Sequence, residues 1–160
     1  LNPLDPDDDW DVVSDGVSFG PTPRDADVTP DVRWPDPFQD SQWISFEPDK
    51  GLGQLDDTDQ VFEYEYCFCL NNGFTNPELQ LRAWADDEIT AMELNGQSLT
   101  YSGDGSVGNG PVDETYTDLS LFQAGDNCLT ITVTDTDGVV SGLNVAGRAR
   151  AENGDCNCKD

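Results

Sequence analysis

Hydrophobic and polar residues alternate with a period of two through much of this chain. In residues 61–70, aromatic or leucine side chains occupy every second position from Phe62 to Leu70, and glutamate or cysteine fills the positions between Phe62 and Leu70. Successive side chains of an extended strand point to opposite faces. This segment therefore predicts a strand whose aromatic face lies in the core.

Similar patterns predict several more short strands. The candidates are residues 79–85, 89–94, 119–122, 129–134 and 142–151, with weaker ones at 10–13 and 27–34. Asn95-Gly96, directly after the segment 89–94, is a tight-turn signal. No segment keeps an apolar stripe at helical spacing over three turns. The pattern predicts an all-β fold, an antiparallel β-sandwich of the jelly-roll kind.

The length of 160 residues fits one compact domain. We place this domain at residues 10–151. Residues 1–9 are rich in Asp and Pro and lack a core-forming pattern, so they are expected to form an extended N-terminal arm. Residues 152–160 form a cysteine-containing C-terminal tail.

The charge excludes some partners. With 33 acidic and 7 basic residues, the net charge is −26, which disfavours binding to nucleic acid or anionic membranes. No apolar run is long enough for membrane insertion. The chain starts at Leu1 without a hydrophobic signal region, and we expect a processed protein that is secreted or displayed at the cell surface.

Most of the acidic excess is expected to be solvated surface, but clustered carboxylates on loops also suit a structural Ca²⁺. Our candidate ligands are Asp86, Asp87, Asp135 and Asp137. Other acidic clusters are Asp5 with Asp7, Asp8 and Asp9, and Asp56 with Asp57 and Asp59. None of these runs has the spacing of an EF-hand loop.

Five cysteines indicate an oxidising compartment and leave one thiol without a partner in the chain. They are arranged as Cys67-Phe68-Cys69, Cys128 and Cys156-Asn157-Cys158. On a strand, residues i and i+2 lie about 6–7 Å apart, which is too far for an easy bond between Cys67 and Cys69. We expect disulfides between the terminal pair and the strand cysteines, within one copy or between copies. A zinc site is the rival interpretation.

A series of short motifs resembles a known family. In order, they are Trp43-Ile44-Ser45, the strand 64–70, the segment 81–87, Leu94-Asn95-Gly96, the segment 125–129 and the segment 141–145. This order is similar to that of galactose-binding-like jelly rolls, especially the domain of bacterial extracellular surface proteins sorted by a PEP-CTERM tail. The resemblance implies a β-sandwich module that often binds carbohydrate, frequently with a structural calcium.

Carbohydrate sites use exposed aromatic faces. Trp34, Trp43 and Trp84 are the candidate platforms, and the alternation of residues 79–85 places Trp84 on the outward face. In the alternative interpretation, the tryptophans pack under loops or between sheets.

Catalysis is not expected. The chain has no histidine, so a Ser-His or Cys-His pair is excluded. Two functional hypotheses remain. The first is a non-enzymatic extracellular subunit that assembles with copies of itself, as a filament or surface layer, through its terminal segments and disulfides. The second is a secreted module that binds polysaccharide.

Overall fold

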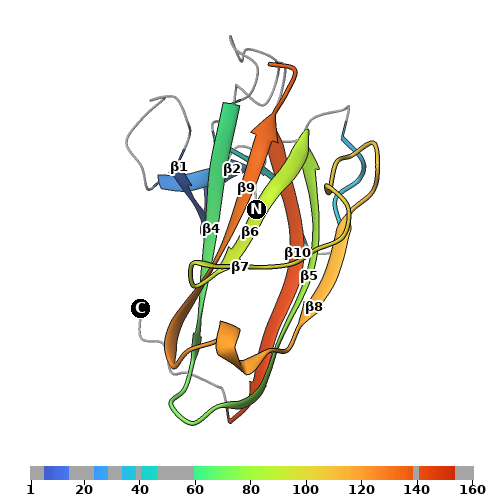
Figure 1. The fold of residues 1–160 in the computed structure, drawn as a ribbon. Helices are drawn as coiled ribbons and strands as arrows, with labels where there is room; N and C mark the ends of the chain where they lie inside the picture. Colours follow the sequence, from blue (N-terminus) through green and yellow to red (C-terminus); the bar gives the residue numbers. More distant parts are fainter. Residues whose placement is uncertain are drawn as a thin grey trace.

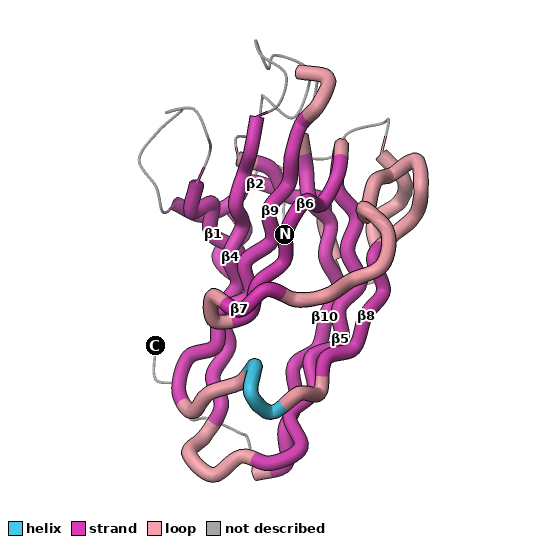
Figure 2. The backbone as a smooth tube through the Cα atoms, in the orientation of Figure 1, coloured by secondary structure: helices cyan, strands magenta, loops and turns pink. Residues whose placement is uncertain are grey.

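The computed structural model describes residues 6–14, 24–28, 34–38, 41–46, 60–138 and 141–153. Figure 2 shows that these residues are almost all strand or loop, with one short 3-10 helix, η1 (Leu119–Leu121). The strands are β1 (Pro6–Ser14), β2 (Arg24–Val28), β3 (Trp43–Ser45), β4 (Gln60–Leu70), β5 (Thr75–Asp86), β6 (Glu88–Leu94), β7 (Gln97–Ser98), β8 (Val112–Tyr116), β9 (Gly125–Asp135) and β10 (Gly142–Glu152).

The strands form one continuous ladder in the order β7-β6-β9-β4-β1-β2-β3-β10-β5-β8. The ladder folds over, so that two antiparallel sheets pack against each other. Strands β4, β9 and β6 belong to one layer, and β10, β5 and β8 belong to the other (Figure 1). The predicted antiparallel β-sandwich is confirmed.

The core lies between the layers and follows the predicted alternation. Phe62 and Tyr64 of β4 are buried, as are Ile131 and Val133 of the neighbouring β9. Phe62 stacks on Phe46 with ring centroids 4.4 Å apart. Burial of each large apolar side chain stabilises the fold by about 1.5–3 kcal/mol, and the period of two delivers these side chains to one face.

A second aromatic cluster covers the outward face of the other sheet. Trp34 stacks on Trp43 with ring centroids 4.5 Å apart, and Phe38 stacks on Trp84 at 4.6 Å. Trp34 lies so close to Gly142 that a Cβ at this glycine would be 2.4 Å from the ring. The segments 34–38 and 41–46 therefore cover one end of β5 and β10.

The turn signal at Asn95-Gly96 is confirmed by its geometry. Leu94 pairs with Gln97, and the intervening residues have φ values of 55° and 73°. The side chain of Asn95 also donates to Oδ1 of the buried Asn127 at 2.9 Å. A short polar network thus ties this turn to the start of β9.

Three expectations about the elements need correction. Residues 119–122 do not form a strand, because Asp118 accepts a hydrogen bond from the Ser120 amide and caps the helix η1. Strand β8 was not predicted. Strand β1 begins at Pro6, inside the predicted arm of residues 1–9. Residues 1–5 of that arm, residues 29–33 of a candidate strand and most of the tail, 154–160, lie outside the described residues.

Candidate cation site

Three carboxylates meet at the end of the sandwich where β5 and β9 finish, which is the upper end in Figure 1. Asp87 connects β5 to β6, Asp135 is the last residue of β9, and Asp137 lies in the turn that follows. Each offers an oxygen, and these oxygens lie within 4.8 Å of one another. The pairing of Glu88 with Thr134 brings the two chain segments together.

Asp135 is the buried member of the group. It continues the inward alternation of Leu129, Ile131 and Val133, and its side chain has 0% exposure. Oδ1 accepts hydrogen bonds from the backbone N–H groups of Asp137 and Gly138, at 3.1 and 2.9 Å. Oδ2 is buried without a hydrogen-bond partner. A buried carboxylate oxygen without a partner is costly, which points to a missing ligand.

Gln60 supplies a second buried oxygen beside Asp135. The two residues are direct partners in the β4–β9 ladder and share the inward face. Gln60 is 6% exposed, and its Oε1 also lacks a hydrogen-bond partner. The sequence reasoning missed this residue, although Gln60 stands two positions before Phe62 in the same alternation.

The carboxylate of Asp87 is oriented by Thr136. Its Oδ2 accepts from the backbone N–H and from the hydroxyl of Thr136, at 2.7 and 2.6 Å. Burial raises the pKa of Asp87, but the hydrogen bonds from Thr136 outweigh this effect and hold the pKa below its usual value. For Asp135, burial dominates and raises the pKa to about 6, and the charges of Asp87 and Asp137 add to the rise.

The ligand set consists of oxygen atoms. Three carboxylates and the neighbouring amide oxygen of Gln60 are hard donors, which suit a hard cation better than a soft one. A cation here would satisfy Oδ2 of Asp135 and offset the repulsion among the carboxylates. The residues present therefore fit a metal ion.

Asp86, the fourth predicted ligand, is not part of this cluster. Its Oδ2 accepts a 2.6 Å hydrogen bond from Nε1 of Trp34. Burial raises the pKa of Asp86 to about 6, although the bond from Trp34 lowers it. Asp5, Asp56, Asp57 and Asp59 lie outside the described residues, as do the side chains of Asp7, Asp8 and Asp9.

The predicted carbohydrate platforms are covered. Trp34 and Trp43 are buried, and they stack on each other. Trp84 points outward from β5 as predicted, but it is half-buried because Phe38 stacks on it. The guanidinium group of Arg82 lies over the ring of Phe38, 4.8 Å from its centroid. The packed interpretation of these three tryptophans agrees with the structure.

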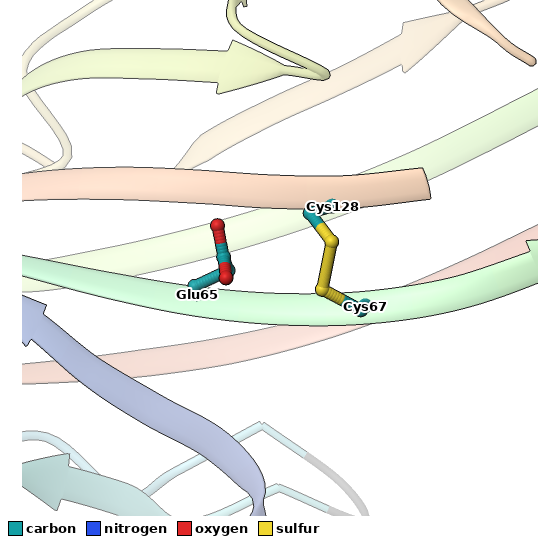
Figure 3. Close-up of side chains that lie close together, drawn as sticks. All are labelled: Glu65, Cys67 and Cys128. Carbon is teal, nitrogen blue, oxygen red and sulfur yellow. A yellow bond between two sulfur atoms is a disulfide. The ribbon is translucent and has the colours of Figure 1, made fainter. Parts of the chain in front are cut away.

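The cysteines of β4 and β9 form a bond that the sequence analysis did not identify. Cys67 and Cys128 are ladder partners and are joined by a disulfide (Figure 3). Glu65 lies nearby, but the two bonded sulfur atoms leave no thiolate there for zinc. Cys69 is disulfide-bonded as well. Cys156 and Cys158 lie outside the described residues.

Comparisons with known proteins identify no relative. No family model matches the chain, and neither a curated protein nor a solved structure does. The resemblance to galactose-binding-like domains stays a prediction. No helix among the described residues is long and apolar enough to cross a bilayer.

Proposed function

We propose that this chain is a non-enzymatic extracellular structural module that binds Ca²⁺ at the end of its sandwich and links to copies of itself. The observation that carries the proposal is the buried Oδ2 of Asp135, which has no hydrogen-bond partner inside a group of three carboxylates. Ca²⁺ favours oxygen ligands in flexible geometry and accepts carboxylates and amide carbonyls together. Asp87, Asp135, Asp137 and Gln60 would hold the ion.

The bound ion would act on stability. It would join β4, the β5–β6 connection and the end of β9, which come from distant parts of the sequence. Binding to the folded state alone stabilises a protein by about 2.7 kcal/mol when the free ligand is at 100 times its Kd. Extracellular surroundings, which are also consistent with the Cys67–Cys128 disulfide, contain enough Ca²⁺ for weak sites to fill.

Calorimetric titration of Ca²⁺ into chelator-treated protein tests this part. We expect one binding event in the wild-type chain and a raised melting temperature. Asp135→Asn keeps an acceptor for the two backbone N–H groups but removes the charge, so binding should fall by at least about tenfold. Asp126→Asn is the matched control, because Asp126 is exposed and lies near the start of β9, whereas Asp135 is its last residue. Absence of binding at millimolar Ca²⁺, or unchanged binding by Asp135→Asn, would refute the site.

The cysteine inventory supports the linkage between copies. Cys67 and Cys128 are bonded to each other, and Cys69 is bonded to a further cysteine. We propose that this partner is Cys156 or Cys158, since no other cysteine of the chain is left. An odd total of five then leaves one terminal thiol for a neighbouring copy.

Non-reducing electrophoresis tests the linkage. Native protein should contain covalent dimers that disappear on reduction, and Cys158→Ser or Cys156→Ser should change the pattern. A disulfide map by mass spectrometry identifies the partner of Cys69 directly. A protein that is purely monomeric under oxidising conditions would contradict the covalent linkage and leave the Ca²⁺ site untouched. The alternative function, binding of polysaccharide, has less support, because Trp34 and Trp43 are buried and Phe38 stacks on Trp84.

A further inference from the structure

The two outward faces of the sandwich carry different charges. All three arginines whose side chains are described, Arg82, Arg148 and Arg150, point outward from β5 and β10. In a chain with a net charge of −26, this concentration of positive charge on one face is unexpected. We call these three side chains the arginine patch.

Acidic residues instead line the outward face of the other sheet. A transverse row crosses four strands, in which Asp11 pairs with Glu65, Glu65 with Thr130, and Thr130 with Glu93. Glu63 and Asp126 point outward from the same sheet. Among the described residues, no Lys or Arg forms an ion pair with these acids. We call Asp11, Glu63, Glu65, Glu93 and Asp126 the acidic face.

The acidic face is unfavourable on its own. Like charges directly opposite each other on neighbouring strands destabilise a sheet, and Asp11 faces Glu65 in this way. The hydroxyl of Thr130 contributes a hydrogen bond to Glu65 at 3.4 Å but no charge. A counter-charge supplied from outside the chain would remove this repulsion.

Two arginines of the patch have acidic partners on the same face, and the third, Arg148, supplies a charge uncompensated among the described residues. Arg150 contacts Glu78 at 2.7 Å. Arg82 contacts Asp113 at 3.5 Å, and the side chains of Arg82 and Asp113 are both more than half exposed. Arg148 is exposed and has no ion pair with a described residue. Arg148 and Arg150 are separated by the same two-residue step as Glu63 and Glu65, about 6–7 Å along a strand.

We propose that the acidic face of one copy docks on the arginine patch of the next copy. The outward faces of two packed sheets point in opposite directions, so this contact uses different surfaces on the two partners. Such heterologous contacts do not close into a dimer and extend into an open stack. The inference rests on the proposed self-assembly and adds its direction, because copies would stack sheet against sheet.

The net negative charge does not prevent this contact. At physiological salt the Debye length is about 8 Å, so distant charges on two copies are screened, whereas charges in direct contact are not. The contact is expected to be weak alone. A disulfide between neighbouring copies would strengthen it by raising the effective concentration.

Sedimentation velocity of thiol-blocked protein tests the contact separately from the covalent linkage. Monomer is first isolated from any covalent dimer by gel filtration, and iodoacetamide added without reductant then caps its free thiol and leaves its internal disulfides intact. In about 150 mM NaCl, where the Debye length is about 8 Å, we expect the wild-type chain to form oligomers larger than dimers as its concentration rises. Arg148→Glu should weaken association at least about tenfold, since it places like charges in contact.

Three further samples make the test decisive. Glu65→Arg should also weaken association, and an equimolar mixture with Arg148→Glu should restore it, because the exchanged charges match again. Asn72→Glu adds a charge in the exposed turn between β4 and β5, at one end of the sandwich, and should associate like the wild type. A thiol-blocked wild type that stays monomeric, or an Arg148→Glu variant that associates equally well, overturns the proposal. Covalent dimers in unblocked protein would still support the proposed linkage.

Discussion

The indole Nε1 of Trp34 donates a 2.6 Å hydrogen bond to Oδ2 of Asp86, although 52 positions separate the two residues. The bond fixes the covering segment 34–38 to the last residue of β5. It also occupies the carboxylate next to Asp87, which belongs to the cation cluster. The aromatic cover and the candidate cation site are therefore adjacent and share one stretch of backbone.

Replacing Trp34 by phenylalanine should lower the free energy of unfolding by about 1–3 kcal/mol, because the partly buried carboxylate of Asp86 loses its donor. Trp84→Phe is the matched control, since Nε1 of Trp84 is buried without a hydrogen-bond partner. Urea denaturation measures both. Equal losses in the two variants would show that ring volume, and not the hydrogen bond, determines the effect.

Stability without Ca²⁺ should decrease as the pH rises from about 4 to about 6. Burial raises the pKa of Asp86 and of Asp135 from 3.8 to about 6. Between these values the folded protein binds more protons than the unfolded chain, so the stabilisation present at low pH is lost as the pH passes the folded pKa. Melting temperatures in chelator across this range provide the measurement.

Asp135→Asn should flatten this pH profile, because it removes one of the two carboxyl groups whose pKa is raised. Ca²⁺ should have the opposite pH dependence, because binding requires ionised carboxylates. The rise in melting temperature on adding Ca²⁺ should therefore grow between pH 5 and 7, close to the pKa of about 6 for Asp135. A Ca²⁺ effect independent of pH would argue against Asp135 as a ligand.

Gly142→Ala should destabilise the protein by about 1–3 kcal/mol, because the new methyl group would overlap a packed ring. Its Cβ would lie 2.4 Å from Cη2 of Trp34, whereas the nearest atom to a Cβ at Gly108 is 3.9 Å away. Gly108→Ala is thus the control. Thermal unfolding of both variants, followed by tryptophan fluorescence, distinguishes them, and similar melting temperatures would contradict the packing of Trp34 on β10.

Asn127→Asp should cost about 2–4 kcal/mol. The fully buried side chain of Asn127 donates Nδ2–H to the carbonyls of Gln123 and Gly125, at 2.9 and 3.0 Å. A carboxylate would place a charged oxygen against these carbonyls. Asn72→Asp, in an exposed turn, should have little effect. Denaturation midpoints that agree within error for the two variants would refute this role.

Local features of the chain were predictable. The alternation in β4 and β9 assigned their inward and outward faces correctly, since the period of two belongs to the strand itself. The Asn95-Gly96 turn was also predictable, because asparagine and glycine readily adopt the positive φ values that such a turn requires. At residues 119–122, the apolar run suggested a strand, but the local cap at Asp118 determined the conformation.

Contacts between distant segments were not predictable. Cys67 and Cys128 both point outward, but their bond depends on the register of β4 against β9, which neither strand specifies alone. Likewise, Trp84 was placed on the correct face, but the segment that covers it lies 46 positions earlier, at Phe38. Of the four predicted carboxylate ligands, the fold brings three together, and Trp34 holds the fourth, Asp86.

The ends of the strand ladder bear on resistance to amyloid. Its terminal strands are β7, with two residues, and β8, with five, and β8 carries Asp113 and Glu114 and follows Pro111. Short edges with charges and a nearby proline discourage backbone pairing with another chain. If fibres of this protein are built through its sheet faces, they should lack the meridional reflection at about 4.7 Å that continuous cross-β stacking produces. Polymers of this kind would grow from folded units and would keep each unit's backbone hydrogen bonds within its own chain.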